Sequence, residues 1–362
     1  VVYLPEGQWY FPFAADMMKR LASKDQMPPS ILVAMKMENP KRFGLLQPGG
    51  EGSQKLAAFL REELIPFVEG NFRTNAHRTL MGWEYGGAFS LYVLAQQPDL
   101  FDAYIASSPF PIGEHNNDFS KVSVADPKFL FFGVSQNESV VNGGVEALEK
   151  KLQDEAIEGL SWQSHLAAGG DLIANHVTSP YPLFLAGLSH LHAPYRPLKP
   201  QTSAEFREMG GVEFAKKHYA QRAKIYGTPE GIAPQSIWWL LRIAAEGNDF
   251  PLFEEILNSV EIFSERFRAF FENEHRYVGY AGYLLENGKH DDAVAMLQKT
   301  VGFYPQSVRA SFRLAKTYET VGNRDAATAE FKRAIKLAEE QSHAQTALIK
   351  EQFEAFKNAA DQ

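Results

Sequence analysis

The chain has 362 residues, of which 45% are hydrophobic and 22% charged, an ordinary globular composition with enough length for two domains. Its formal net charge of −8 argues against nucleic acid as a partner, because a phosphate-binding face needs clustered Lys and Arg. There is no cysteine, which excludes disulfides, thiolate catalysis and Cys-ligated zinc. No apolar run approaches the roughly 18 residues of a membrane span.

The first half of the chain alternates between apolar strands and helices. Strands are predicted at residues 1–4, 30–35, 78–81, 101–106, 128–134 and 160–166. Helices are predicted at 13–22, 54–69, 88–95, 144–155 and 183–191, and a glycine-rich loop at 41–53. Unbroken apolar strands that alternate with helices are typical of a doubly wound, mostly parallel sheet.

The third strand runs into the turn Gly82-Trp83-Glu84-Tyr85-Gly86, and a helix of small residues follows. Strand, G-x-x-x-G turn and helix form the shape of the nucleophile elbow of α/β-hydrolases, in which the middle residue is normally serine. Here that residue is Glu84. The two glycines remove side chains that would collide where strand and helix approach closely. The turn indicates a hydrolase scaffold and leaves its chemistry open.

The pattern changes after residue 192. Residues 193–200 are rich in proline and are interpreted as a linker between a domain at 1–192 and an all-helical domain at 201–362. In the second domain, helices are predicted at 202–219, 234–246 and 341–360.

An internal repeat lies within this helical domain. Gly288 and Gly322 are 34 residues apart, which is the tetratricopeptide period, and Ala281 and Ala315 match in the same register. Tetratricopeptide-like repeats are therefore predicted over about 273–340, with 250–271 as a degenerate partner. Such repeats either bind a protein or peptide in a groove, or serve as a packing or dimerisation surface.

Read together, these segments resemble the putative esterase family that includes esterase D and the ferric-enterobactin esterases. The matching stretches are 3–10, 59–66, 72–74 and, most strongly, 78–109, and the resemblance covers roughly residues 1–192. It implies an α/β-hydrolase domain that takes a small-molecule carboxylic or siderophore-type ester and needs no cofactor. No metal site is proposed, because the histidines are scattered and no carboxylate cluster has ligand spacing.

The resemblance also implies site residues. The family elbow reads Gly-His-Ser-x-Gly-Gly, so Glu84 takes the place of the nucleophile, and His176 matches the catalytic base ahead of the last helix. Glu138, after the strand at 128–134, is the preferred acid, with Asp171 as the alternative. The oxyanion hole would use the backbone N–H of Tyr85 and that of Gly7 or Gln8.

Three functions remain open from the sequence. The first is an esterase that is impaired or altered at its nucleophile. The second is a non-catalytic pseudoenzyme that binds a ligand or protein. The third is a hydrolase whose carboxylate attacks an sp3 carbon. Because an α/β-hydrolase sheet normally begins earlier, we expect residues upstream of Val1, and the compartment stays open between periplasm and cytoplasm.

Overall fold

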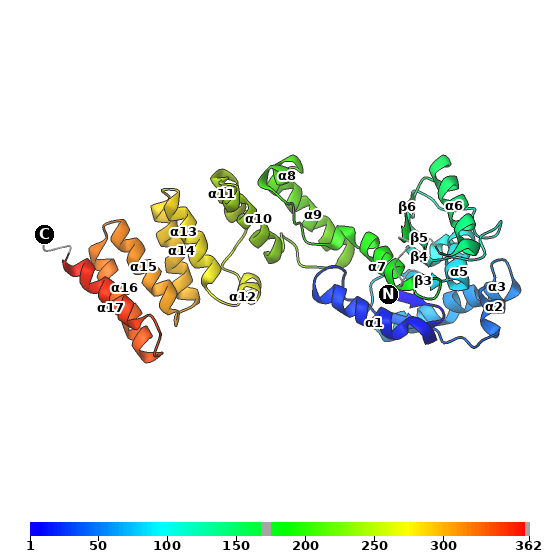
Figure 1. Ribbon diagram of the computed structural model, residues 1–362, viewed down its shortest axis with the longest axis horizontal. Helices are drawn as coiled ribbons and strands as arrows, with labels where there is room; N and C mark the ends of the chain where they lie inside the picture. The colour runs from blue at the N-terminus through cyan, green and yellow to red at the C-terminus, as the bar shows by residue number, and fades with distance from the viewer. Residues whose placement is uncertain (136, 168–174, 359–362) are drawn as a thin grey trace. The chain divides into compact units, whose positions relative to one another are not determined.

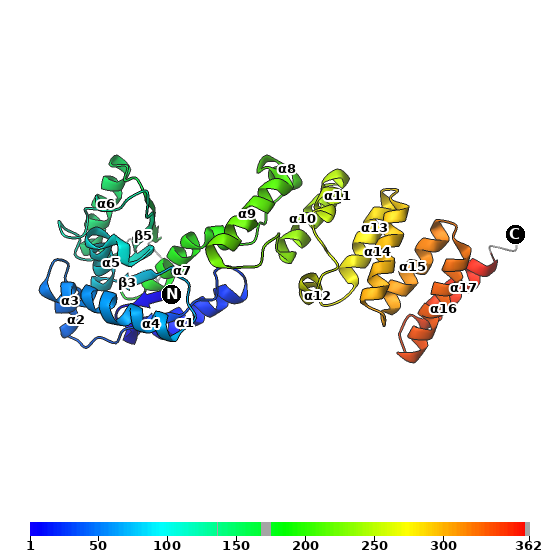
Figure 2. The ribbon, with the colours of Figure 1, turned by 180° about the vertical axis from the view of Figure 1, so that it is seen from behind.

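The computed structural model describes residues 1–135, 137–167 and 175–358 (Figure 1). The chain divides into two compact units. The first comprises Val1–Arg196 with Lys224–Thr228, and the second Pro197–Ala223 with Pro229–Gln362. Figure 2 shows the same ribbon from behind.

The first unit is built on a six-stranded sheet in the order β2-β1-β3-β4-β5-β6, with every neighbouring pair parallel. The strands are β1 (Val2–Leu4), β2 (Leu32–Ala34), β3 (Thr79–Trp83), β4 (Ala103–Ser107), β5 (Lys128–Ser135) and β6 (Leu160–Ala167). The predicted doubly wound parallel sheet is confirmed, and it has helices on both faces.

Alternation of side chains along the strands gives each face of the sheet its own core. Val2 and Leu4 point toward one face and Tyr3 toward the other. The first face packs against α1 (Gly7–Ser23) and α7 (Pro180–Leu191). The second packs against α3 (Glu51–Phe59), α4 (Ile65–Asn71), α5 (Tyr85–Gln96) and α6 (Ser139–Asp154).

The predicted loop at 41–53 is wrong, because it holds α2 (Lys41–Leu46) and the start of α3. Gly52 serves a close approach of these helices, because a Cβ there would lie 2.0 Å from the carbonyl oxygen of Gly44. The helix predicted at 54–69 is divided by a π-helical turn, Leu60–Leu64, and the one predicted at 13–22 already begins at Gly7.

All the regular secondary structure in the described part of the second unit is helical. Its helices are α8 (Ser203–Glu208), α9 (Gly211–Tyr226, whose last residues count with the first unit), α10 (Pro234–Glu246), α11 (Phe250–Asn258), α12 (Glu265–Phe271), α13 (His275–Glu286), α14 (His290–Phe303), α15 (Val308–Thr320), α16 (Arg324–Glu340) and α17 (Thr346–Asn358). The single helix predicted at 202–219 is wrong. The chain breaks there at Gly210 and Gly211, whose φ angles of 104° and 60° are left-handed.

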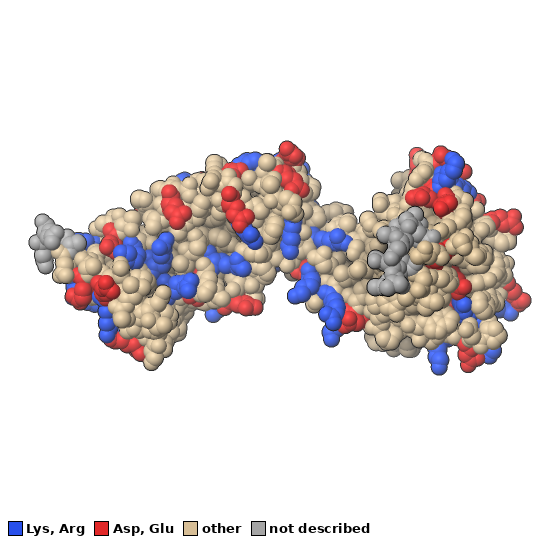
Figure 3. Space-filling model, viewed as in Figure 1, with Lys and Arg blue, Asp and Glu red and all other residues tan. Residues whose placement is uncertain are grey.

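The repeat positions take the roles that their spacing predicts. The alanines at 281, 293, 315 and 327 are buried where α13 to α16 cross, since a small side chain lets helices approach closely. On the face seen in Figure 3, acidic and basic side chains are interspersed. Among the described residues, no helix has the length and apolar character needed to cross a membrane.

Candidate functional site

Five charged side chains follow five different strands and meet at one edge of the sheet. Glu6 comes after β1, Arg42 after β2, Glu84 after β3, Glu138 after β5 and His176 after β6. Because the strands are parallel, their carboxyl ends lie together, and this is where open α/β sheets place their ligand sites. We call these five residues the charged row.

Glu84 occupies the elbow between β3 and α5. Its φ of 50° and ψ of −115° are strained for a residue with a side chain, and its N–H donates to the carbonyl of Ser107 at 3.0 Å. A Cβ on Gly82 would lie 2.3 Å from the backbone of Gly86, so only glycine allows strand and helix to cross this closely. The backbone therefore keeps the elbow shape although serine is absent.

Both carboxylate oxygens of Glu84 are engaged. Nη2 of Arg42 donates to Oε2 at 2.8 Å, and Nε2 of His176 lies 3.5 Å from Oε1. Burial by itself would raise the pKa of Glu84, but the hydrogen bonds from His176 and Arg42 outweigh burial and lower it below its ordinary value. Glu84 is thus ionised at neutral pH and held from two sides.

Arg42 joins Glu84 to a second carboxylate, that of Glu6. The guanidinium also lies over the rings of Trp9 and Phe43, 4.9 Å and 4.1 Å from their centroids. Burial raises the pKa of Glu6 to about 7, although Arg42 acts in the opposite direction. Its Oε2 has no hydrogen-bond partner among the described residues.

His176 is bound on its other side by Glu138, whose Oε1 lies 2.6 Å from Nδ1. The carboxylate of Glu138 is itself fixed by the hydroxyl of Ser108 and the N–H of Ser135, each at 2.7 Å. Hydrogen bonding to Glu138, and then to Glu84, raises the pKa of His176 to about 9. Asp171, the alternative acid, lies outside the described residues.

Trp83 supports the loop that carries His176. Its indole N–H donates to the carbonyl of His176 at 2.9 Å, and the two rings lie 4.8 Å apart. The hydroxyl of Tyr10 donates to the next carbonyl, that of Val177, at 3.0 Å. The aromatic residue before Glu84 therefore positions the histidine.

The predicted oxyanion donors lie at the starts of two helices. Tyr85 is the first residue of α5 and Gly7 the first of α1. The N–H of Gly7 donates to the carbonyl of Met35 at 2.8 Å, and Oε1 of Gln8 accepts from the N–H of Met37 at 3.0 Å. These two hydrogen bonds thus connect the start of α1 to the segment after β2.

The structure brings together Glu84, His176 and Glu138, and it adds two residues that sequence reasoning missed. Glu6 and Arg42 had a usable signal, because each is a charged residue soon after an apolar strand of a parallel sheet. Among the described residues, no group of three or more His, Asp or Glu side chains is arranged to hold a metal ion.

Comparison with known proteins matches two segments of the chain to known families. Residues 1–143 match the sequence model of the putative esterases, and residues 284–350 match that of a tetratricopeptide repeat. Residues 1–143 are thus similar to the putative esterases, and residues 284–350 are similar to tetratricopeptide repeats.

Individual relatives match shorter stretches or the fold alone. The ferri-bacillibactin esterase BesA of Bacillus subtilis is 39% identical over 59 residues, which are 16% of this chain and a fifth (20%) of that protein. An IroE-like serine hydrolase from Shewanella oneidensis superposes with a TM-score of 0.51 at 19% identity, over 73% of this chain and 89% of its own. An uncharacterised protein from Capnocytophaga ochracea superposes with a TM-score of 0.54 at 15% identity, over 99% of this chain and 90% of its own. At these identities the two structures show that the fold is shared.

Proposed function

We propose that this chain is a ligand-binding protein on an esterase scaffold, whose ester-hydrolysing chemistry is switched off at Glu84. The proposal depends on one observation: both oxygens of the Glu84 carboxylate are in ionic contact. Oε2 lies 2.8 Å from Nη2 of Arg42, and Oε1 lies 3.5 Å from Nε2 of His176. A nucleophile must be free to approach a carbonyl carbon, and a carboxylate bound through both oxygens is not.

The state of His176 supports the same conclusion. In serine hydrolases a neutral imidazole takes the proton of the attacking hydroxyl. With its pKa raised to about 9, His176 is an imidazolium at neutral pH and has no free lone pair to act as a base. The histidine therefore acts here as a cation between two carboxylates.

A carboxylate nucleophile that attacks an sp3 carbon is the second candidate. It is favoured by the ionised state of Glu84, whose pKa is lowered. It is disfavoured by His176, because release of the alkyl ester needs a base to activate water. Incubation with an alkyl halide or epoxide, followed by mass spectrometry of the Glu84 peptide, tests this route directly: an adduct supports it, and an unmodified peptide contradicts it.

The ligand class is taken from the family and from the residues around Arg42. BesA is named as a ferri-bacillibactin esterase, and Trp9 and Phe43, each 39% exposed, offer aromatic surface beside the charged row. We therefore propose a siderophore-type ester or its acyl fragment as ligand. Titration with a ferric catecholate should quench tryptophan fluorescence in the wild type and less in Trp9→Phe; an unchanged signal in both would contradict this ligand class.

Glu84→Ser is the decisive substitution for the chemistry. The elbow glycines, His176 and its partner Glu138 all remain, and loss of the Glu84 carboxylate removes one of the two hydrogen bonds that raise the pKa of His176. The hydroxyl should therefore restore hydrolysis of short p-nitrophenyl esters by about 10²-fold or more over the wild type. Glu84→Ser combined with His176→Ala is the matched control and should return to the wild-type rate. If the wild type already hydrolyses these esters and Glu84→Ala loses nothing, the proposal is wrong.

A further inference from the structure

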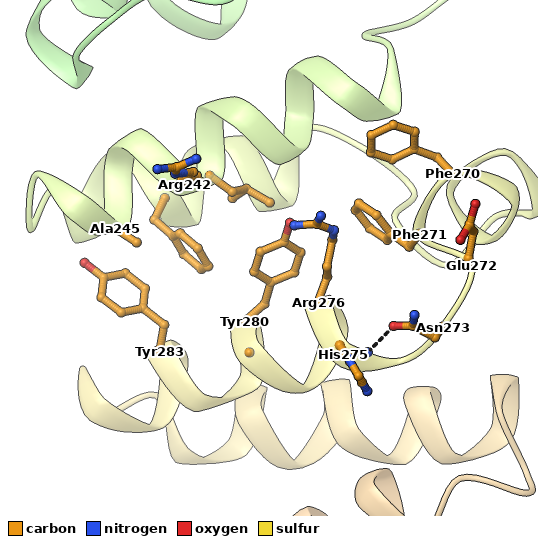
Figure 4. Close-up of a pocket in the computed structure, with 13 residues that line it drawn as sticks. Arg242, Ala245, Phe270, Phe271, Glu272, Asn273, His275, Arg276, Tyr280 and Tyr283 are labelled. Carbon is orange, nitrogen blue, oxygen red and sulfur yellow. Dashed lines mark hydrogen bonds between the residues drawn. The ribbon is translucent and has the colours of Figure 1, made fainter.

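The second unit contains a cavity of about 740 Å³ that is separate from the charged row (Figure 4). It lies among α10, α11, α12 and α13 and ahead of the segment that matches the tetratricopeptide model. Its apolar lining is mostly aromatic and includes Phe253, Phe270, Phe271 and Tyr283. Such walls suit an apolar or aromatic ligand body.

Arg276 brings an uncompensated positive charge to this cavity. Its guanidinium lies over Trp238 at 4.4 Å and near Phe271 at 5.7 Å. Among the residues that the structure describes, it has neither a carboxylate nor another hydrogen-bond acceptor. Arg242, on the opposite wall, is already paired with Glu246 at 2.7 Å.

Tyr280 adds a hydrogen-bond donor with no partner. It stands one helical turn after Arg276 on α13, and both side chains rise from this helix into the space below α10 in Figure 4. The hydroxyl oxygen is buried and makes no hydrogen bond within the described part of the chain. Burial raises the pKa of this hydroxyl, so it keeps its proton at neutral pH. A buried donor without an acceptor is costly, and a bound ligand would remove that cost.

The charges around the cavity favour a ligand with a single negative charge. Within the described part of the chain, Arg276 is the lining cation without a partner, because Arg242 is already paired with Glu246, and the carboxylate in the lining, that of Glu272, is exposed. One free guanidinium beside one hydroxyl donor matches a carboxylate, which accepts hydrogen bonds through two oxygens. The aromatic walls exclude a ligand that is polar all round.

We propose that this cavity binds an organic carboxylate with an aromatic or apolar body. Arg276 and the hydroxyl of Tyr280 hold the carboxylate, and the phenylalanine side chains contact the body. The same chemistry is presented by a free aromatic acid and by the end of a peptide whose last residue is apolar. This proposal is independent of what happens at Glu84.

Calorimetric titration of the full chain tests the site with three probes. N-acetyl-phenylalanine should bind, and its amide, which lacks only the charge, should bind about tenfold more weakly or worse. The tripeptide Gly-Gly-Phe with a free carboxylate distinguishes the sources. Tighter binding of the tripeptide assigns the site to peptide ends, and tighter binding of the acetylated amino acid assigns it to small acids; either supports the shared chemistry.

Three variants link binding to the named residues. Arg276→Gln should weaken binding of the acid by about tenfold or more, and Tyr280→Phe by about threefold to tenfold. Arg242→Gln, in the same cavity but already paired, should change affinity less than about twofold. Arg276→Lys keeps the charge and should retain part of the affinity, and thermal melts check that each variant is folded. Equal binding of acid and amide, no binding of any probe at about 10 mM, or equal losses in Arg276→Gln and Arg242→Gln would overturn the proposal.

Discussion

Arg42 is the only cation that contacts both Glu6 and Glu84 within the charged row. Its side chain is 7% exposed, and that of Glu6 is 1% exposed. Removal of one partner from a buried ion pair leaves an uncompensated charge. We therefore expect Arg42→Gln to lower the free energy of unfolding by about 3 kcal/mol, measured by urea denaturation.

Arg61→Gln is the matched control for Arg42→Gln. Arg61 also bonds a carboxylate, that of Asp99, but the two side chains are 40% and 61% exposed. Water screens such a pair, so its loss should cost no more than about 1 kcal/mol. If Arg42→Gln and Arg61→Gln lower the free energy of unfolding equally, the ion pairs of Arg42 stabilise the fold no more than an exposed surface pair does.

The pKa of His176 predicts how stability depends on pH. Because the pKa rises from 6.5 to about 9 on folding, the stabilisation is fully present below about pH 6.5 and is lost as the pH rises through 9. Glu138→Gln removes the main cause and should move the imidazole titration, followed by NMR, toward 6.5. It should also flatten the stability profile between these two values. An unchanged titration in Glu138→Gln would show that the hydrogen bond from Glu138 does not set this pKa.

At the residue scale, the sequence indicated which side chains meet but not their protonation states. Glu84, Glu138 and His176 could be found because motif order and strand ends are visible in the sequence. Arg42 lies in a segment that looked like a loop, and its role depends on Glu6 and Glu84, which precede and follow it by 36 and 42 residues. Its position after an apolar strand was a usable signal, but the pairings themselves, over such distances in the sequence, leave no local pattern.

The crossing of β3 and α5 is the most demanding contact between elements in the first unit. A Cβ on Gly82 would lie 2.3 Å from backbone atoms of Gly86, which cannot move aside like a side chain. Gly82→Ala should therefore cost about 3 kcal/mol or more, or prevent soluble expression. Gly70→Ala, in α4 with no atom within 4 Å of the added methyl group, should be neutral or slightly stabilising in the same denaturation assay. Similar stability of Gly82→Ala and the wild type would contradict this reading of the elbow.

How well a helix or strand could be predicted from the sequence depended on the role of the glycines in it. The six strands and α5, α7 and α10 carry continuous apolar patterns, and all were predicted to within a few residues. Glycines misled the prediction at 41–53, where Gly44 lies inside α2 and Gly52 lets α3 approach α2 closely, and neither glycine ends its helix. Between α8 and α9 the opposite error occurred: the apolar spacing predicts one continuous helix, but Gly210 and Gly211 end α8 and separate it from α9.

At the scale of the whole molecule, each unit has a hydrophobic core of its own. Leu130 is buried in the first and Leu314 in the second. We expect two transitions in calorimetric unfolding, since separate cores melt as separate cooperative units. Leu130→Ala should lower one transition and Leu314→Ala the other, by about 2–5 kcal/mol each. One shared transition that both substitutions lower equally would contradict two independent cores.

The charged row holds three carboxylates and two cations. One more proton would make the net charge of the charged row zero. Glu6, with a pKa of about 7, is the carboxylate that binds this proton most readily. A ligand that excludes water from the rest of the charged row would then draw a proton from solution onto Glu6 as it binds. Recognition at this site would be an acid–base reaction with the medium, visible as a binding heat that changes with the ionisation enthalpy of the buffer.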